Sequence, residues 1–274
     1  MERIKQALER AREQRTDPFA TPGAHTHPAR KRDHTPAVAP AEIVYTQTRQ
    51  LELDPAYLRN NRVVSGPEDL VAERYKILRT RVLQRMRANN WRSLAITSPT
   101  EGCGKTLTAL NLAISMAREV NQTVLLVDLD LKRPQVRRYL TQEDLPGISD
   151  YLVNDAPVAD LLIKPKGIDR LVVLPGRASV THSSEMLSSP KMVGLIQEMK
   201  ARYPSRLVLL DMPPVLACDD VLAFSPHVDA VLLVAEDEKT GKEDLARASA
   251  LLEKMNILGF VLNKSSAQDS GYYY

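Results

Sequence analysis

The sequence predicts an α/β protein in which a mainly parallel β-sheet is flanked by helices on both faces. Short apolar runs alternate with longer segments of helical periodicity, which is typical of strands that are buried on both sides. One apolar run leads into a glycine-containing loop that ends in Gly-Lys-Thr and precedes a helical segment. Two other runs end in aspartate. Together these features predict a P-loop NTPase fold whose ligand binds at the carboxyl ends of the strands.

Four segments are expected along the 274 residues. Residues 1–15 have the apolar spacing of an amphipathic helix, and residues 16–64 form a proline-rich linker that is expected to be largely disordered, with residues 43–64 ambiguous. Residues 65–263 form the P-loop domain, and residues 264–274 form a mobile tail. Hydrophobic residues make up 43% of the chain, which is enough for one sizeable core.

The strands are expected where the short apolar runs occur, at residues 94–96, 123–128, 171–174, 206–211, 230–235 and 258–262. Helices are expected over residues 67–89 and after the Gly-Lys-Thr loop from residue 107. Ser189 followed by Pro190 predicts the start of a helix that runs to about residue 202. Thr240 and Glu243 form a predicted capping box, which opens a helix to about residue 255.

Charge and cysteine content predict a cytoplasmic chain that does not bind nucleic acid. The net charge is only +3. Residues 74–92 hold seven Lys or Arg and no acid, a face that is expected to be solvated, although nucleic acid, an anionic membrane or an acidic protein would also suit it. The cysteines, Cys103 and Cys218, have no partner at metal-ligand spacing and indicate a reducing compartment. The sequence shows no signal peptide and no apolar run near the roughly 20 residues that span a bilayer.

The loop after residues 94–96 is predicted to bind phosphate. Glycines allow backbone N–H groups to point at phosphate oxygens, and the start of the following helix adds its positive end. Lys105 is expected to reach the β- and γ-phosphates, and the Thr106 hydroxyl is expected to bind Mg²⁺. The motif is incomplete, because Pro99 stands where the usual first glycine would be. The predicted nucleotide-binding residues are Gly102, Cys103, Gly104, Lys105, Thr106 and Leu107.

Carboxylates at the ends of two strands are predicted to complete a Mg²⁺–nucleotide site. Asp128 and Asp211 end apolar runs, and Asp130 follows Asp128 by two positions. Mg²⁺ takes few protein carboxylates and keeps several waters, so a small number of acids is sufficient. The predicted metal ligands are Thr106, Asp130 and Asp211.

The segment Asp128-x-Asp130-x-Lys132-Arg133-Pro134 resembles the second Walker A motif of the bacterial tyrosine kinases, and Asp211-x-Pro213-Pro214 resembles their Walker B motif. The similarity includes Glu185–Lys191, Asp220, the run Glu73–Thr80 and the terminal Gly271–Tyr274. The charged helix and proline-rich linker are similar to the exosortase-associated branch, which occurs in exopolysaccharide loci. The family favours arginine where Lys132 and Lys76 stand, and lysine keeps the charge but loses the bidentate fork.

The resemblance implies ATP-dependent tyrosine autophosphorylation that regulates exopolysaccharide synthesis or export. Its catalytic residues would be Lys105, Asp128 and Asp130, and its phosphoacceptors would be Tyr272, Tyr273 and Tyr274. Glu73, Lys76 and Arg79 would serve homo-oligomer assembly. The resemblance also implies a separate membrane-embedded activator of the polysaccharide co-polymerase type. The chain would then be cytoplasmic and associated with the inner membrane through that partner.

Phosphoryl transfer depends mainly on positioning and on charge neutralisation, which Lys105, the loop amides and Mg²⁺ would supply. A tyrosine hydroxyl has a pKa of about 10 and benefits from a nearby base. Asp128 is the predicted base, with Asp130 and Asp211 at the metal, although these roles can be exchanged. The eleven residues from Lys264 span at most about 36–40 Å, which suits presentation of the tyrosines to a neighbouring subunit.

Two other functions share most of these features. One is an ATPase switch that resembles the MinD/ParA group, whose loop carries an early lysine that Ser98-Pro99-Thr100 lacks. The other is a non-catalytic, nucleotide-binding regulator of polysaccharide export. Incubation with labelled ATP separates the three, because it yields labelled tyrosine, labelled free phosphate or neither.

Overall fold

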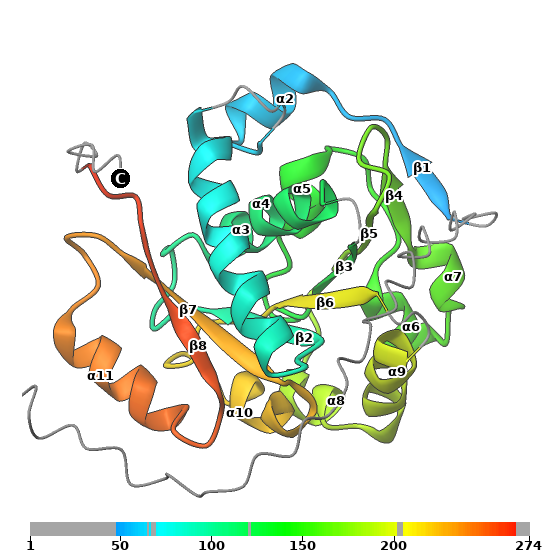
Figure 1. Cartoon of the computed structure of the whole chain (residues 1–274). Coiled ribbons are helices and arrows are strands. Elements are labelled where there is room, and N and C mark those ends of the chain that lie inside the picture. The colour runs from blue at the N-terminus through cyan, green and yellow to red at the C-terminus, as the bar shows by residue number, and fades with distance from the viewer. Residues whose placement is uncertain (1–47, 65, 67–69, 120–121, 202–204, 267–274) are drawn as a thin grey trace, which may run out of the picture. The chain divides into compact units, whose positions relative to one another are not determined.

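The computed structural model describes residues 48–64, 66, 70–119, 122–201 and 205–266 (Figure 1). The predicted helix at residues 1–15, most of the predicted linker and the terminal tyrosines therefore lie outside the described residues. None of the described helices is long and apolar enough to cross a membrane.

The described strands form one eight-stranded sheet in the order β1-β4-β5-β3-β6-β2-β7-β8. Every neighbouring pair is parallel except β4 and β5, which are antiparallel. The predicted fold class is thus confirmed. The strands are β1 (Arg49–Leu51), β2 (Ser93–Thr97), β3 (Thr123–Asp128), β4 (Ile163–Pro165), β5 (Leu171–Leu174), β6 (Arg206–Asp211), β7 (Ala230–Glu236) and β8 (Ile257–Asn263).

Helices cover both faces of the sheet (Figure 1). Successive residues of a strand point to opposite faces, so Leu94 and Ile96 pack in one apolar cluster while Ala95 packs in the other. The first face carries α2 (Pro55–Asn60), α3 (Leu70–Ala88), α4 (Lys105–Ala117) and α5 (Val136–Leu140). The second face carries α6 (Ile148–Asn154), α7 (Val158–Leu161), α8 (Ser183–Leu187), α9 (Pro190–Ala201), α10 (Asp220–Phe224) and α11 (Lys242–Leu251).

Strand order positions the candidate site. β6 lies between β2 and β3, and every residue of these three strands is buried. In the register of the sheet, Asp211 is the partner of Asp128 on one side and of Ile96 on the other. The two strand-end aspartates and the loop that follows β2 therefore meet at one edge of the sheet.

The prediction of a linker up to residue 64 is wrong for residues 48–64. β1 pairs with β4, and Asp54 caps α2 by accepting a hydrogen bond from the Ala56 N–H at 2.8 Å. Leu51, Leu58 and Val63 are buried in the core. These segments are too short to show a periodic pattern, and their stability comes from docking against β4 and against the helices of the first face.

The predicted start of α9 is confirmed and that of α11 is wrong. The Ser189 hydroxyl accepts a hydrogen bond from the Met192 N–H at 3.2 Å, and Pro190 occupies the first helical position. In contrast, the Thr240 hydroxyl accepts from the Glu236 N–H at 2.8 Å, and α11 begins only after Gly241. Thr240 closes the turn after β7 rather than capping a helix, because β7 supplies a free N–H nearby.

Candidate active site

The loop between β2 and α4 has the backbone conformation that its glycines permit. Gly102 and Gly104 have φ angles of 82° and 88°, in the left-handed region that other residues avoid. A Cβ at Gly104 would lie 2.2 Å from the Asn263 Nδ2. That amide donates to the Cys103 carbonyl at 2.9 Å, and the Lys264 ammonium donates to the Gly102 carbonyl at 2.8 Å. The end of β8 thus holds the loop from outside.

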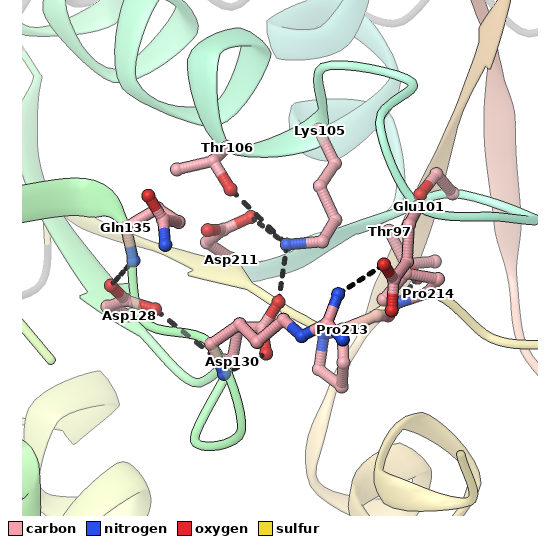
Figure 2. Close-up of polar contacts among 12 residues, drawn as sticks. Thr97, Glu101, Lys105, Thr106, Asp128, Asp130, Gln135, Asp211, Pro213 and Pro214 are labelled. Atoms are coloured by element: carbon pink, nitrogen blue, oxygen red, sulfur yellow. Dashed lines mark hydrogen bonds and ion pairs between the residues drawn. The ribbon is translucent and has the colours of Figure 1, made fainter. Parts of the chain in front are cut away.

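Lys105 extends from the first turn of α4 toward the carboxylates at the strand ends (Figure 2). Its Nζ donates to Asp130 Oδ2 at 2.8 Å and to the Thr106 hydroxyl at 3.2 Å, and it lies 3.6 Å from Asp211 Oδ1. Burial would lower the pKa of Lys105, but the charges of Asp211 and Asp130 outweigh burial and raise it. The ammonium therefore stays charged in this buried position.

Asp128 is fully buried and organises the loop that follows β3. Its Oδ2 accepts from the backbone N–H groups of Gln135 and Val136 at 3.0 and 2.9 Å, and its Oδ1 accepts from Asp130 N–H at 3.3 Å (Figure 2). Burial, reinforced by the charge of Asp211, raises the pKa of Asp128 to about 8.

Asp211 is a buried carboxylate that lacks hydrogen-bond donors. Both of its carboxylate oxygens are enclosed, and neither accepts a hydrogen bond from the residues that the structure describes. Burial raises the pKa of Asp211, while the charge of Lys105 opposes this effect. A buried carboxylate without hydrogen-bond donors is costly even with the Lys105 ammonium 3.6 Å away, so this side chain fits a cation that arrives with a ligand.

The donor set suits Mg²⁺ bound together with phosphate. Within the described part of the chain, no three His, Cys, Asp or Glu side chains could hold a metal ion by themselves. Mg²⁺ usually combines one or two carboxylates with substrate phosphates and water, so the Thr106 hydroxyl and the oxygens of Asp130 and Asp211 are sufficient.

A cavity of about 380 Å³ opens where these elements meet. The Glu101 carboxylate on the loop after β2 forms an ion pair with the Arg133 guanidinium on the loop after β3, which links the two loops. The lining residues are Glu101, Gly102, Gly104, Lys105, Thr106, Asp130, Lys132, Arg133, Gln135, Tyr139, Pro213, Pro214, Ala217 and Cys218.

The structure brings most of the predicted site residues together, at or behind this cavity. Two predicted nucleotide-binding residues do not line it. The Cys103 side chain is buried, with its sulfur 3.6 Å from the hydroxyl oxygens of Thr100 and Thr240, and Leu107 packs against the core. Tyr272, Tyr273 and Tyr274 lie outside the described residues.

The residues predicted to serve assembly lie on α3 and do not reach the cavity. Glu73 and Lys76 are paired with each other near the surface. Arg79 turns inward, donates to the Ser115 carbonyl at 3.0 Å and pairs with Glu119 at 3.3 Å. Arg79 thus contributes to the packing of α3 on α4 within one chain.

Several cavity residues were not predicted as site residues. Lys132 and Arg133 were indicated by their position two and three residues after Asp130, within the motif-like segment 128–134. Glu101 was indicated only by its place in the glycine loop. Gln135 lies on the loop after β3 and Tyr139 lies on α5. Both line the cavity because of where the loop and the helix run, which no sequence pattern indicates.

Asp220 is completely buried, with Lys132 as its charge partner at 3.7 Å.

A glycine loop that meets strand-end carboxylates at one edge of a mainly parallel sheet defines a P-loop nucleotide-binding protein. Residues 94–272 match the model of the CobQ/CobB/MinD/ParA nucleotide binding domain. The chain is 31% identical over 220 residues to the tyrosine-protein kinase YwqD of Bacillus subtilis, and the match covers 78% of this chain and 91% of that protein. The chain therefore belongs to the bacterial tyrosine kinase family, within the proteins that carry this nucleotide-binding domain.

Other relatives agree with this assignment. The succinoglycan biosynthesis transport protein ExoP of Rhizobium meliloti is 30% identical over 219 residues, which cover 77% of this chain and 27% of that protein. The kinase domain of Escherichia coli tyrosine kinase ETK superposes with a TM-score of 0.67 at 28% identity, covering 77% of this chain and 83% of that chain.

The chimerical protein CapA2B2 gives a TM-score of 0.68 at 25% identity, covering 80% of this chain and 94% of that chain. The septum site-determining protein MinD of Pyrococcus horikoshii OT3, complexed with Mg-ADP, gives a TM-score of only 0.54 at 25% identity, with coverages of 65% and 72%. The kinases thus resemble this chain more closely than this MinD does.

Proposed function

We propose that this chain is an ATP-dependent tyrosine autokinase that phosphorylates Tyr272, Tyr273 and Tyr274 of a neighbouring copy. One observation carries the proposal: the Lys105 ammonium lies between Asp130 and Asp211 beside a cavity formed by the phosphate-binding loop and the loop after β3. This arrangement provides the cation and the carboxylates that phosphoryl transfer requires.

In the proposed mechanism, the amides of the loop and the Lys105 ammonium bind the phosphates of ATP. Lys105 exchanges its carboxylate partners for phosphate oxygens when the nucleotide enters. Thr106, Asp130 and Asp211 hold Mg²⁺, which when bound offsets charge on the phosphates. The tyrosine oxygen then attacks the γ-phosphorus, the bond to the β-phosphate oxygen breaks, ADP leaves, and a carboxylate receives the phenolic proton.

Asp128 is the proposed acceptor of that proton. Burial and the nearby charge of Asp211 raise the pKa of Asp128, which makes its ionised carboxylate a stronger proton acceptor than an exposed aspartate. Asp130 is the alternative, because it lines the cavity, whereas the oxygens of Asp128 already accept hydrogen bonds from backbone N–H groups. The two roles are separable by the substitutions described in the Discussion.

Transfer between subunits is tested by mixing two variants. A Lys105→Met chain keeps its tyrosines but loses the phosphate-binding ammonium, and a chain that ends at residue 266 keeps the site but lacks the tyrosines. Intact mass after incubation with ATP and Mg²⁺ should show phosphate on the Lys105→Met chain only in the mixture. A mixture without phosphate on that chain would exclude transfer in trans, and wild type with Tyr272–Tyr274 replaced by Phe controls for other acceptors.

The proposal extends to partners and location. The chimera CapA2B2 and the transport protein ExoP support a role beside a membrane-embedded activator of the polysaccharide co-polymerase type. We therefore place the chain in the cytoplasm, at the inner membrane through that separate partner, in exopolysaccharide production of the exosortase-associated kind. Glu73, Lys76 and Arg79 would join copies of the chain into a homo-oligomer.

An ATPase switch of the MinD type remains the second candidate, because that fold is shared. The absence of an early lysine from Ser98-Pro99-Thr100 and the higher TM-scores of the kinases favour autophosphorylation. Labelled ATP distinguishes them, since a switch releases free phosphate and leaves tyrosine unlabelled. A non-catalytic regulator of polysaccharide export would neither release labelled free phosphate nor label tyrosine.

A further inference from the structure

Asp220, at the start of α10, carries a buried carboxylate whose role the proposed mechanism leaves open. Its side chain is 0% exposed, and neither carboxylate oxygen accepts a hydrogen bond from the described residues. The charge partner is the Lys132 ammonium, 3.7 Å from Oδ1. A carboxylate buried without hydrogen bonds costs stability, so Asp220 depends on the Lys132 ammonium to offset its charge.

Lys132 lies on the loop after β3 and lines the nucleotide cavity with its side chain 49% exposed. The other cations of the cavity are already engaged, Lys105 with Asp130 and Arg133 with Glu101. At 3.7 Å the contact with Asp220 is too long for a hydrogen bond. Asp220 therefore attracts the Lys132 ammonium without occupying its N–H donors.

We propose that Asp220 is a positioning residue, which holds the Lys132 ammonium in the cavity so that it binds the terminal phosphate of a nucleoside triphosphate. The inference rests on the proposed nucleotide-binding function. The amides of the glycine loop hold the inner phosphates, and Lys132 approaches from the other loop, beside Asp130. Its contact is therefore with the γ-phosphate, which ADP lacks.

The test compares Asp220→Asn with Asp219→Asn, a matched control that removes one negative charge at the adjacent, exposed position. The affinities of the full chain for a non-hydrolysable ATP analogue and for ADP are measured by calorimetry with Mg²⁺. Asp220→Asn should lose about tenfold in affinity for the analogue and almost none for ADP, as expected for one charge-assisted hydrogen bond. Asp219→Asn should match wild type for both.

Two further variants separate positioning from folding. Lys132→Gln should show the same selective loss, and the double variant should lose no more than either single one, because both remove one interaction. Thermal unfolding of Asp220→Asn should be no lower than that of wild type, since the variant removes a buried charge. If Asp220→Asn does not fold, the selective loss in Lys132→Gln decides whether the ammonium acts on the terminal phosphate.

Equal losses for the analogue and for ADP, or additive losses in the double variant, would overturn the inference. Phosphorylation of the wild-type tail, measured in parallel, reports separately on the kinase proposal. A wild-type chain that binds the analogue selectively through Lys132 but labels no tyrosine would sink only the kinase proposal. Failure of wild type to bind either nucleotide would overturn both.

Discussion

At the scale of single residues, the site is an arrangement of buried charges around one ammonium. Lys105 lies close to Asp130 and Asp211, and Asp128 lies beside Asp211 in the register of the sheet. The three carboxylates differ in their hydrogen bonds. Asp128 accepts hydrogen bonds from backbone N–H groups, and Asp130 accepts one from the Lys105 ammonium. Asp211 accepts no hydrogen bond from the described residues. Different surroundings imply different roles for residues of the same type.

Substitution of Asp128 and Asp130 by Asn should assign those roles. Asp128→Asn should lower the rate of tail phosphorylation about 100-fold or more and leave the affinity for Mg²⁺ and an ATP analogue within a few-fold, because a base acts only in the chemical step. Asp130→Asn should weaken that affinity. Intact mass spectrometry and calorimetry measure the two effects, and the reverse pattern would make Asp130 the base.

Asp229 offers a residue-scale test of stability away from the site. Burial would raise the pKa of Asp229, but hydrogen bonds from the Lys200 ammonium and from the N–H groups of Arg92 and Ser93 outweigh burial and lower it. The ionised form is therefore favoured by folding. Its contribution is complete above the ordinary range of an aspartate and is lost as the pH falls through the lowered pKa.

Asp229→Asn should lower the free energy of unfolding by about 1 kcal/mol at pH 7, because one partner of charged hydrogen bonds is lost. The difference from wild type should shrink as the pH is lowered from 5 to about 3, within the range where aspartates titrate. Urea unfolding at each pH measures this difference. A gap that stays constant over that range would contradict the assignment.

At the scale of elements, the end of β8 supports the phosphate-binding loop. Asn263 and Lys264 donate hydrogen bonds to the carbonyls of Cys103 and Gly102, which fixes the orientation of these two peptide units. Residues 264–274 follow directly, so the predicted tail begins beside the loop. The end of β8 therefore both holds the loop and leads into the predicted tail.

Asn263→Ala should weaken nucleotide binding about fivefold, the equivalent of one hydrogen bond of about 1 kcal/mol, because the loop is less preorganised before binding. Hydrogen exchange of residues 98–104 should become faster in the variant without nucleotide. Asn256→Ala, which removes an exposed amide that bonds the Asp229 carbonyl elsewhere on the sheet, is the control. Unchanged exchange in the loop would show that β8 does not hold it.

At the scale of the whole molecule, the residues proposed to serve assembly share α3 with residues that pack against the core. Lys76 pairs with Glu73 near the surface and is available to another copy, whereas Arg79 is tied to Ser115 and Glu119 at the end of α4. The two cations should therefore have different effects when they are removed.

Lys76→Ala should reduce homo-oligomer formation, measured by sedimentation, and leave the melting temperature unchanged, because exposed ion pairs contribute little to stability. Arg79→Ala should lower the melting temperature as well, since the Ser115 carbonyl and Glu119 lose their partner. Identical sedimentation of wild type and both variants would place the assembly surface elsewhere.

The sequence alone determined the class of fold and predicted most of the residues that the structure gathers at or behind the cavity. Apolar strand runs, the Gly-Lys-Thr loop and strand-end aspartates allow this because they are local patterns with direct physical meaning. The predicted core strands lie close to the observed ones. The observed β2 extends one residue beyond the predicted range at each end, and so does β8. The sequence showed no sign of β4 or of the short helices of the second face, since segments of a few residues are held by tertiary contacts.

Only the tertiary structure decided how these parts meet. Strand order placed Asp211 between the loop after β2 and Asp128, and it buried Asp220 behind Lys132. It also turned Arg79 inward and docked residues 48–64 on the domain. Burial and long-range contact depend on elements that are distant in the chain, so no local pattern specifies which charges are enclosed or which lysines line the cavity.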